Sequence, residues 1–172
     1  MTGFGNIMRT KIILRTFLIL LIIIGNIGCD QVSKKIVRHT IVPYQTISIL
    51  NDHLTVTRVE NPGAFLSLGD SLPKATKNIL LSVLPLLVLA FIFYYALTKH
   101  GIHKAMLIGL CSIIGGGIGN IFDRLVYGSV TDFLHIKLGI FQTGVFNMAD
   151  LSIVTGTVII LWNLFSKKKQ PV

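Results

Sequence analysis

Two carboxylates of the chain, Asp132 and Asp150, have no basic residue close to them in the sequence. Asp132 lies in SVTDFLHI between apolar neighbours, and Asp150 lies in FNMADLSI at the start of a long apolar run. Two such carboxylates that lie close together cannot both ionise cheaply, so one pKa rises and the pair shares a proton. One carboxylate can then deprotonate a water molecule while its protonated partner donates to a carbonyl oxygen. These residues therefore suit peptide hydrolysis without a metal or a covalent intermediate.

The other five acids have simpler interpretations. Asp30 can pair with Lys34 one helical turn later, and we predict an ion pair between Asp123 and the adjacent Arg124. Three more acids fall in a polar segment where water would solvate them, namely Asp52, Glu60 and Asp70. The two unpaired acids are therefore the candidates for catalysis.

The five histidines do not gather into a metal site. His100 and His103 form a His-x-x-His pair without a nearby acid, whereas His39, His53 and His135 are scattered along the chain. A zinc protease needs its ligands and a base in one place. We therefore expect no metal and no cofactor. A serine–histidine pair stays open as an alternative, although no histidine falls inside an apolar stretch.

The elements that must position the two acids are those of a membrane protein. The 172 residues are 52% hydrophobic and 13% charged, with a mean hydropathy of +0.73, which leaves too little polar surface to cover a soluble globule. A soluble helical bundle would need polar faces at helical period, which ILLSVLPLLVLAFIFYYAL lacks. We predict one membrane-embedded domain over residues 1–172, mainly α, with four transmembrane helices. They are expected at residues 12–28, 79–98, 105–122 and 148–165.

The segment between the first two helices, residues 40–72, is not membrane-like. It contains TISILNDHLTVTRVE, a weak alternation of apolar and polar residues that is rich in β-branched side chains. The turn signal Asn61-Pro62-Gly63 follows. We predict a small extracytoplasmic β element that rests on the membrane surface. Asn61 is either a turn residue or a polar group directed at a ligand.

The basic residues orient the chain. With four spans, both termini and the loop at 99–104 share one side, which carries eight bases and no acid. The other side carries eight bases and all seven acids, so the two sides have net charges of +8 and +1. Short segments rich in Lys and Arg stay in the cytoplasm, so we expect cytoplasmic termini and the two unpaired acids outside. The basic charge indicates topology and attraction to membrane lipids, and no nucleic-acid partner.

The first helix ends in GNIGCD, which is similar to the end of a lipoprotein signal peptide. Asn26 stands where such a signal needs a leucine-like residue, and three more spans follow, so we expect the helix to continue past Cys29. Cys29 and Cys111 lie at different depths, which argues against a disulfide, and we interpret both as buried packing residues.

The third helix contains GGGIG. Gly115 and Gly119 form a small-xxx-small pair that lets helices approach closely. A nucleotide-binding loop is discounted, because no Lys-Ser/Thr ending and no preceding strand accompany the glycines.

Five blocks, in the order GCDQVSK, ENPGAF, GGGIGNIFDR, VTDF and FNMAD, resemble those of lipoprotein signal peptidase (signal peptidase II), the membrane aspartyl protease family of bacteria. The resemblance covers the chain from about residue 12 to 165. It implies an enzyme of the cytoplasmic membrane that removes signal peptides from diacylglyceryl-modified prolipoproteins, cutting before the lipidated cysteine at the outer face. It also implies that Asp132 and Asp150 are the catalytic dyad. The expected partners are lipidated prolipoproteins and membrane lipids, and we expect a monomer.

The resemblance assigns further residues that line or support the site: Asn61, Gly63, Asn120, Arg124 and Asn147, with Asp30 and Lys34 as the polar pair at the end of the first helix. One departure is visible. The family often has Gly-Ala-Ala after the first asparagine, whereas here Phe65 follows Gly63-Ala64. The departure concerns the shape of this loop and leaves the expected chemistry unchanged.

Two other classes of protein are weighed against hydrolysis. A proton- or ion-coupled transporter also uses paired acids, but it would place them near the bilayer midplane and often shows internal repeats. The chain has no acid in the middle of a predicted span and no evident repeat. A non-catalytic membrane scaffold would leave the two unpaired acids unexplained.

Overall fold

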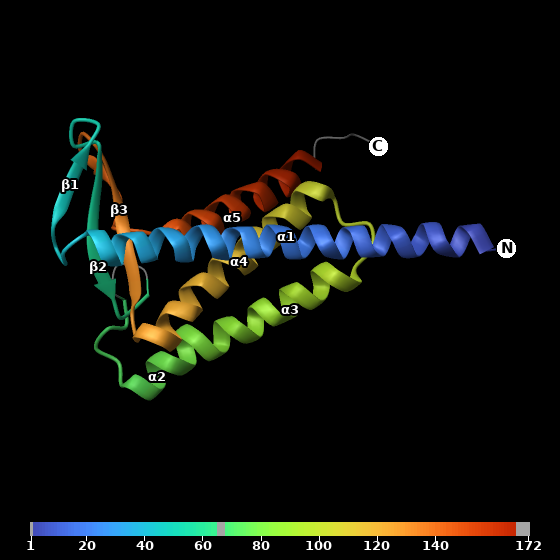
Figure 1. Ribbon diagram of the computed structural model, residues 1–172, viewed down its shortest axis with the longest axis horizontal. Coiled ribbons are helices and arrows are strands. Elements are labelled where there is room, and N and C mark those ends of the chain that lie inside the picture. Colours follow the sequence, from blue (N-terminus) through green and yellow to red (C-terminus); the bar gives the residue numbers. More distant parts are fainter. Residues whose placement is uncertain (1, 65–67, 168–172) are drawn as a thin grey trace.

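Four helical spans run between two ends of the molecule (Figure 1). The computed structural model describes residues 2–64 and 68–167, so Phe65, Lys168 and Lys169 lie outside the described residues. All four spans are long and apolar enough to cross a membrane, which confirms the predicted fold class. They are α1 (Thr2–Thr40), a second span made of α2 (Lys74–Asn78), the π-helical turn η2 (Ile79–Val83) and α3 (Leu84–Thr98), then α4 (Lys104–Tyr127) and α5 (Met148–Lys167).

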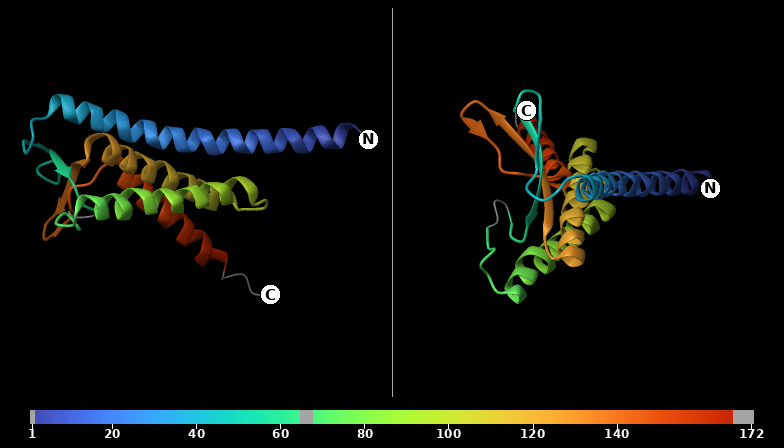
Figure 2. Two further views of the ribbon diagram at one scale, coloured as in Figure 1. Left: turned by 90° about the horizontal axis from the view of Figure 1, so that it is seen from below. Right: turned by 60° about the vertical axis from the view of Figure 1, so that its left-hand side comes forward.

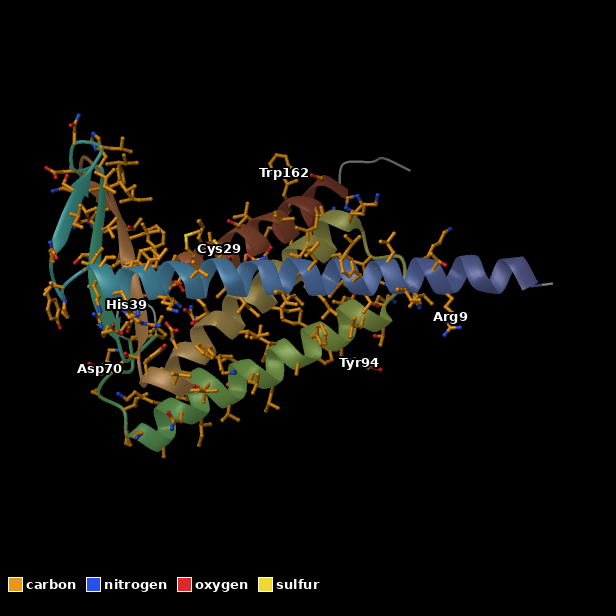
Figure 3. The ribbon with its side chains drawn as sticks, viewed as in Figure 1. Arg9, Cys29, His39, Asp70, Tyr94 and Trp162 are labelled. Atoms are coloured by element: carbon orange, nitrogen blue, oxygen red, sulfur yellow. The ribbon has the colours of Figure 1, made fainter. Side chains whose placement is uncertain are left out.

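α1 continues past Cys29 as expected, and it runs beyond the predicted span of residues 12–28 as far as Thr40. The charges of Asp30 and Lys34 interrupt the apolar run of the sequence, yet both side chains are fully buried because they pair with each other and with α4. Cys29 is exposed on this helix, where Figure 3 labels it, so its interpretation as a buried packing residue is wrong. Cys111 is buried, and both cysteines are free thiols.

A four-stranded antiparallel sheet lies at one end of the bundle, with its strands running across the direction of the helices (Figure 1). Its order is β1 (Thr46–Ile49), β2 (Leu54–Asn61), β3 (Val130–Leu138) and β4 (Phe141–Gln142). The hairpin of β1 and β2 falls in the predicted β region. The sequence analysis did not predict β3 and β4, which follow α4 and complete the sheet. In this register Val59 lies opposite Asp132.

α4 is the central helix, since it packs against α1, α3 and α5 and more than half of its span is buried. The predicted small-residue face is confirmed. A Cβ atom at Gly115 would lie 2.6 Å from Asn26 Cβ, and one at Gly119 would lie 2.5 Å from Asp30 Oδ2. α5 crosses α4 at an equally close contact of glycines near its middle and diverges from α1 toward its C-terminal end (Figure 2).

The outer surfaces of the spans are apolar. Tyr94 and Trp162 project away from the bundle, and Arg9 lies toward the end that is remote from the sheet (Figure 3). The N-terminal end of α1 and the C-terminal end of α5 lie at this same remote end (Figure 1). This arrangement fits a multi-pass protein whose helices present apolar side chains to lipid.

Candidate active site

Asp132 and Asp150 come together at the sheet end of the bundle. Asp132 is the third residue of β3 and is 4% exposed, and Asp150 lies in the first turn of α5. Gly128 ends α4 in the left-handed conformation, with φ of 78°, and turns the chain directly into β3. The two carboxylates line one small cavity, with a volume of about 70 Å³.

Asn147 explains why a carboxylate begins an apolar helix. Its Oδ1 atom accepts a hydrogen bond from the backbone N–H of Asp150 (2.9 Å), and its own N–H donates to Asp150 Oδ2 (3.1 Å). This reciprocal pair is a capping box at the N-terminus of α5, where the helix dipole also favours a negative charge. Asn147 is fully buried, and its Nδ2 atom donates to Asp132 Oδ1 at 2.7 Å. One asparagine therefore holds both acids.

Two more asparagines complete the contacts of the dyad. Asn61 Nδ2 donates to Asp132 Oδ2 at 3.0 Å, and Asn120 Nδ2 donates to Asp150 Oδ1 at 2.8 Å. All four carboxylate oxygens thus accept an N–H from an asparagine. Asn61 is also a turn residue, because its Oδ1 atom accepts from the backbone N–H of Gly63 at 3.0 Å.

Arg124 borders the small cavity on one side. Its guanidinium donates to the carbonyl oxygens of Gly63 (3.0 Å) and Asn120 (3.4 Å). It also lines a larger cavity of about 680 Å³ between α2 and the end of α4. Arg124 is therefore the residue shared by the dyad cavity and a space that could admit part of a peptide.

The pKa of Asp132 is raised from 3.8 to about 6. Burial is the main cause, since it penalises the charged form. The negative charge of Asp150 raises this pKa further, whereas the hydrogen bonds from Asn61 and Asn147 and the charge of Lys34 lower it. The electrostatics therefore favour a proton on this carboxylate.

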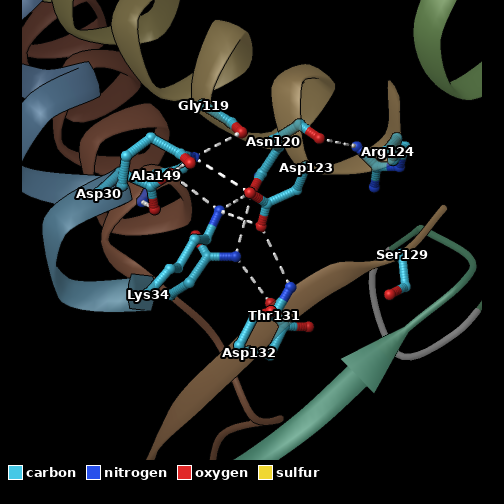
Figure 4. Close-up of polar contacts among 12 residues, drawn as sticks. Asp30, Lys34, Gly119, Asn120, Asp123, Arg124, Ser129, Thr131, Asp132 and Ala149 are labelled. Carbon is cyan, nitrogen blue, oxygen red and sulfur yellow. Dashed lines mark hydrogen bonds and ion pairs between the residues drawn. The ribbon is translucent and has the colours of Figure 1, made fainter. Parts of the chain in front are cut away.

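A buried charge network lies on the α1 and α4 side of Asp132 (Figure 4). Lys34 Nζ lies 2.8 Å from Asp30 Oδ2, which confirms the predicted pair, and 3.1 Å from Asp123 Oδ2. Arg38 also pairs with Asp123, at 2.8 Å. The predicted ion pair of Asp123 with Arg124 is wrong, because adjacent helical residues point in different directions and Asp123 faces α1.

Thr131 fastens β3 to this network one residue before Asp132. Its N–H donates to Asp123 Oδ2 at 3.2 Å, and its hydroxyl accepts from Arg38 Nε at 2.8 Å. The same hydroxyl lies 3.0 Å from Glu60 Oε2. Glu60 is half-buried in the sheet, so the prediction that water solvates it in a polar loop is wrong. The sequence analysis did not select Asp123, Arg38, Thr131 or Glu60, because their partners are distant in the chain.

The described residues contain no group of three or more His, Cys, Asp or Glu side chains placed to hold a metal ion. The site is built from carboxylates, carboxamides and basic side chains.

The family model described as Signal peptidase (SPase) II matches residues 18–166. The chain belongs to this family. It is 32% identical over 162 residues to the lipoprotein signal peptidase of Desulforapulum autotrophicum, which covers 94% of this chain and 98% of that protein. It is 36% identical over 154 residues to the lipoprotein signal peptidase of Clostridioides difficile, with 89% and 99% covered.

A solved bacterial membrane enzyme has the same fold. Its TM-score is 0.78 at 23% identity, and the match covers 90% of this chain and 94% of that chain. Membership of the signal peptidase II family makes the protein a multi-pass membrane enzyme, an aspartic peptidase that acts on peptide bonds. The reaction of the family is removal of the signal peptide from prolipoproteins.

Proposed function

We propose that Asp132 and Asp150 are the catalytic dyad of this signal peptidase, and that they activate water to cut before a diacylglyceryl-modified cysteine. The observation that carries the proposal is their placement on one small cavity of about 70 Å³. A space of this size is large enough to admit a water molecule beside the carboxylates. The asparagine N–H groups orient all four oxygens, and neither acid forms an ion pair with another described residue.

The charges around the dyad support one shared proton. Four carboxylates and three bases lie in the cluster: Asp30, Asp123, Asp132 and Asp150 with Lys34, Arg38 and Arg124. The cluster is neutral when one carboxylate carries a proton. Uncompensated charge is costly in a buried site, so the neutral state is favoured. The raised pKa of Asp132, about 6, supports that residue as the carrier of the proton.

In the proposed reaction, ionised Asp150 removes a proton from water, and the water oxygen attacks the carbonyl carbon of the scissile bond. Protonated Asp132 donates its proton to the carbonyl oxygen, which gives a neutral tetrahedral intermediate. The intermediate then returns a proton to the ionised Asp132 as its carbonyl re-forms. The proton held by Asp150 passes to the leaving nitrogen, and the C–N bond breaks.

The larger cavity beside Arg124 supplies the space for the substrate peptide, and the exposed apolar surfaces of the spans let a lipidated substrate approach within the membrane plane. Asp132 lies in β3 and Asp150 lies in the first turn of α5, at the sheet end of the spans. This position favours a protease over a transporter with acids near the midplane. We assign this end to the outer side and both termini to the cytoplasm from the charge distribution.

The dyad is tested with purified full-length protein and a lipidated prolipoprotein substrate. Asp132→Asn and Asp150→Asn should each abolish cleavage, a loss of about four orders of magnitude, while the variants stay folded. Asp52→Asn is the matched control, because Asp52 is exposed in the β1–β2 turn and should be silent. Near-native turnover by either dyad variant would sink the assignment.

The orientation is tested by cysteine labelling in a Cys29→Ser/Cys111→Ala background. Ile140→Cys, in the exposed turn between β3 and β4, should label from outside. Thr98→Cys, at the end of α3, should label only from the cytoplasmic side. The reverse pattern would put the dyad in the wrong compartment for exported lipoproteins and would favour the transporter.

A further inference from the structure

Lys34 touches neither acid of the dyad, yet all of its hydrogen-bonding capacity is used next to them. The side chain is fully buried, and its ammonium contacts Asp30 Oδ2 (2.8 Å), Asp123 Oδ2 (3.1 Å) and Asn120 Oδ1 (3.0 Å). An ammonium has three protons to donate and cannot accept. The two aspartates account for its charge. The third contact, to the amide of Asn120, is the one that charge pairing does not explain.

That contact decides which way the Asn120 amide faces. Because an ammonium can only donate, the atom of Asn120 that faces it must be the oxygen. The Nδ2 atom then faces the other way, where it donates to Asp150 Oδ1 at 2.8 Å. Asn147 Nδ2 donates to the same Asn120 oxygen at 3.1 Å and to Asp132 Oδ1 at 2.7 Å. A network of hydrogen bonds through the Asn120 amide therefore joins Lys34 to both acids.

We propose that Lys34 is a positioning residue for the dyad: its ammonium fixes the orientation of the Asn120 amide, and that amide in turn holds the donors that face both carboxylates. The inference rests on the proposed function of Asp132 and Asp150. Without the ammonium, only the hydrogen bonds with Asn147 and Asp150 hold the Asn120 amide, so its orientation is fixed less firmly. In the flipped orientation its oxygen would face the carboxylate of Asp150. The lone pairs of the amide oxygen would then repel those of the Asp150 carboxylate, which must stay ionised to act as the general base.

Lys34 also contributes charge, and this second effect can be separated from the first. The charged groups near it come from every element packed around it. They are Asp30 and Arg38 on α1, Asp123 and Arg124 on α4, Asp150 on α5, Asp132 on β3, and Glu60 with Arg58 on β2. Loss of one cation from this cluster favours retention of the shared proton, so the alkaline limb of the pH–rate profile should move to higher pH.

Three variants of the full-length enzyme separate orientation from charge. Lys34→Met removes both and should lower kcat about 10- to 100-fold and raise the alkaline limb by about one pH unit. Asp30→Asn/Lys34→Met removes one charge of each sign, so kcat should fall while the limb stays in place. Arg38→Met removes a cation that pairs with Asp123, so the alkaline limb of the pH–rate profile should move to higher pH. Because Arg38 does not contact Asn120, the change in kcat should be much smaller than for Lys34→Met.

Each variant is assayed with the lipidated substrate from about pH 5 to 9, with thermal unfolding in the same detergent as the check on folding. A folded double variant that keeps the kcat of the wild type would overturn the proposal, as would a Lys34→Met variant with the wild-type kcat and pH profile. If the double variant does not fold, the single variant carries the test. These outcomes differ from failure of the dyad itself, which appears as turnover by Asp132→Asn or Asp150→Asn.

Discussion

The two ends of the helix bundle hold their polar groups for different purposes. At the sheet end, four carboxylates and three basic side chains are packed together with little access to water. At the remote end, the described residues include no carboxylate. There Arg15 donates to the carbonyl oxygens of Ala96 and Lys99, and Asn163 contacts His103 at 2.8 Å.

Each end contains a buried asparagine, but the partners differ. Asn147 donates to an acid of the dyad, whereas Asn163 joins the C-terminal part of α5 to the start of α4. Burial of charge is costly unless every group is paired, so the sheet end maintains an expensive arrangement. The contacts of Arg15 and Asn163 at the remote end join helices to one another. Substitutions at the two ends should therefore separate catalysis from stability.

The largest contrast is expected between the two asparagines. Asn147→Ala removes the side-chain donor to Asp132 and the acceptor of the Asp150 backbone N–H. It should lower kcat by about 100- to 1,000-fold, comparable to the loss of one oriented donor at a reaction centre. Asn163→Ala should leave kcat unchanged and lower the free energy of unfolding by about 1 kcal/mol. Steady-state rates with the lipidated substrate and thermal unfolding in detergent measure the two effects. Equal loss of activity in both variants would remove the distinction between the ends.

The pH dependence of stability should also belong to the sheet end. The pKa of Asp132 is about 6 in the folded protein, compared with 3.8 for an unperturbed aspartate, which represents the unfolded chain. Folding therefore favours its protonated form. Its contribution is full below about pH 4 and is lost as the pH rises through about 6, which amounts to about 3 kcal/mol. Between about pH 4 and 7 the wild type should therefore lose stability relative to Asp132→Asn. Parallel unfolding curves for the two proteins would contradict the raised pKa.

Two glycines of α4 provide a smaller contrast. A Cβ at Gly119 would lie 2.5 Å from Asp30 Oδ2, so Gly119→Ala should displace the partner of Lys34 and lower kcat about tenfold or more. A Cβ at Gly109 would lie 2.7 Å from the carbonyl oxygen of Gly156, so Gly109→Ala should cost about 1 to 3 kcal/mol of stability. It should retain kcat wherever it is folded. An active Gly119→Ala enzyme with reduced stability alone would show that this contact is only structural.

The smallest expected effect is that of a chelator. The described residues offer no cluster suited to a metal ion, and the proposed water activation uses carboxylates alone. Incubation with a strong chelator should leave the rate unchanged at both high and low substrate concentration. Loss of activity that zinc restores would replace the aspartyl mechanism with a metal-dependent one.

The four spans were predictable because each is a nearly uncharged run of the right length, and length and hydropathy are local properties. The sequence also indicated that the first helix continues past Cys29 with Asp30 and Lys34 paired. It did not indicate that the helix runs to Thr40 or that α4 supplies further partners for Lys34, because those contacts are distant in the chain. The strand β3 was not predicted because its burial pattern is irregular. Its first four residues are all buried, so VTDFLHIKL lacks the alternation that marks a half-exposed strand.

The proximity of Asp132 and Asp150 was predictable from what the two acids lack, because neither has a base nearby in the sequence. Residue types and spacing alone could not identify the groups that support them, since those contacts depend on directions in space. Asp123 and Arg124 are neighbours in the chain, yet one faces Lys34 and Thr131 and the other faces Gly63. The packing of α1, β3 and the turn at Gly63 around α4 decides which contacts form.

The pairing of β2 with β3 has a consequence for the synthesis and membrane insertion of the chain. Asn61 and Asp132, which bond across the site, are 71 residues apart, and the chain enters and leaves the membrane between them. The hairpin of β1 and β2 can close as soon as it is made, but β3 arrives only after α3 and α4 have been inserted. Asp150 emerges from the ribosome later still. A partly translated chain therefore lacks the proposed dyad. We expect proteolytic activity to begin only when insertion of the nascent protein is nearly complete.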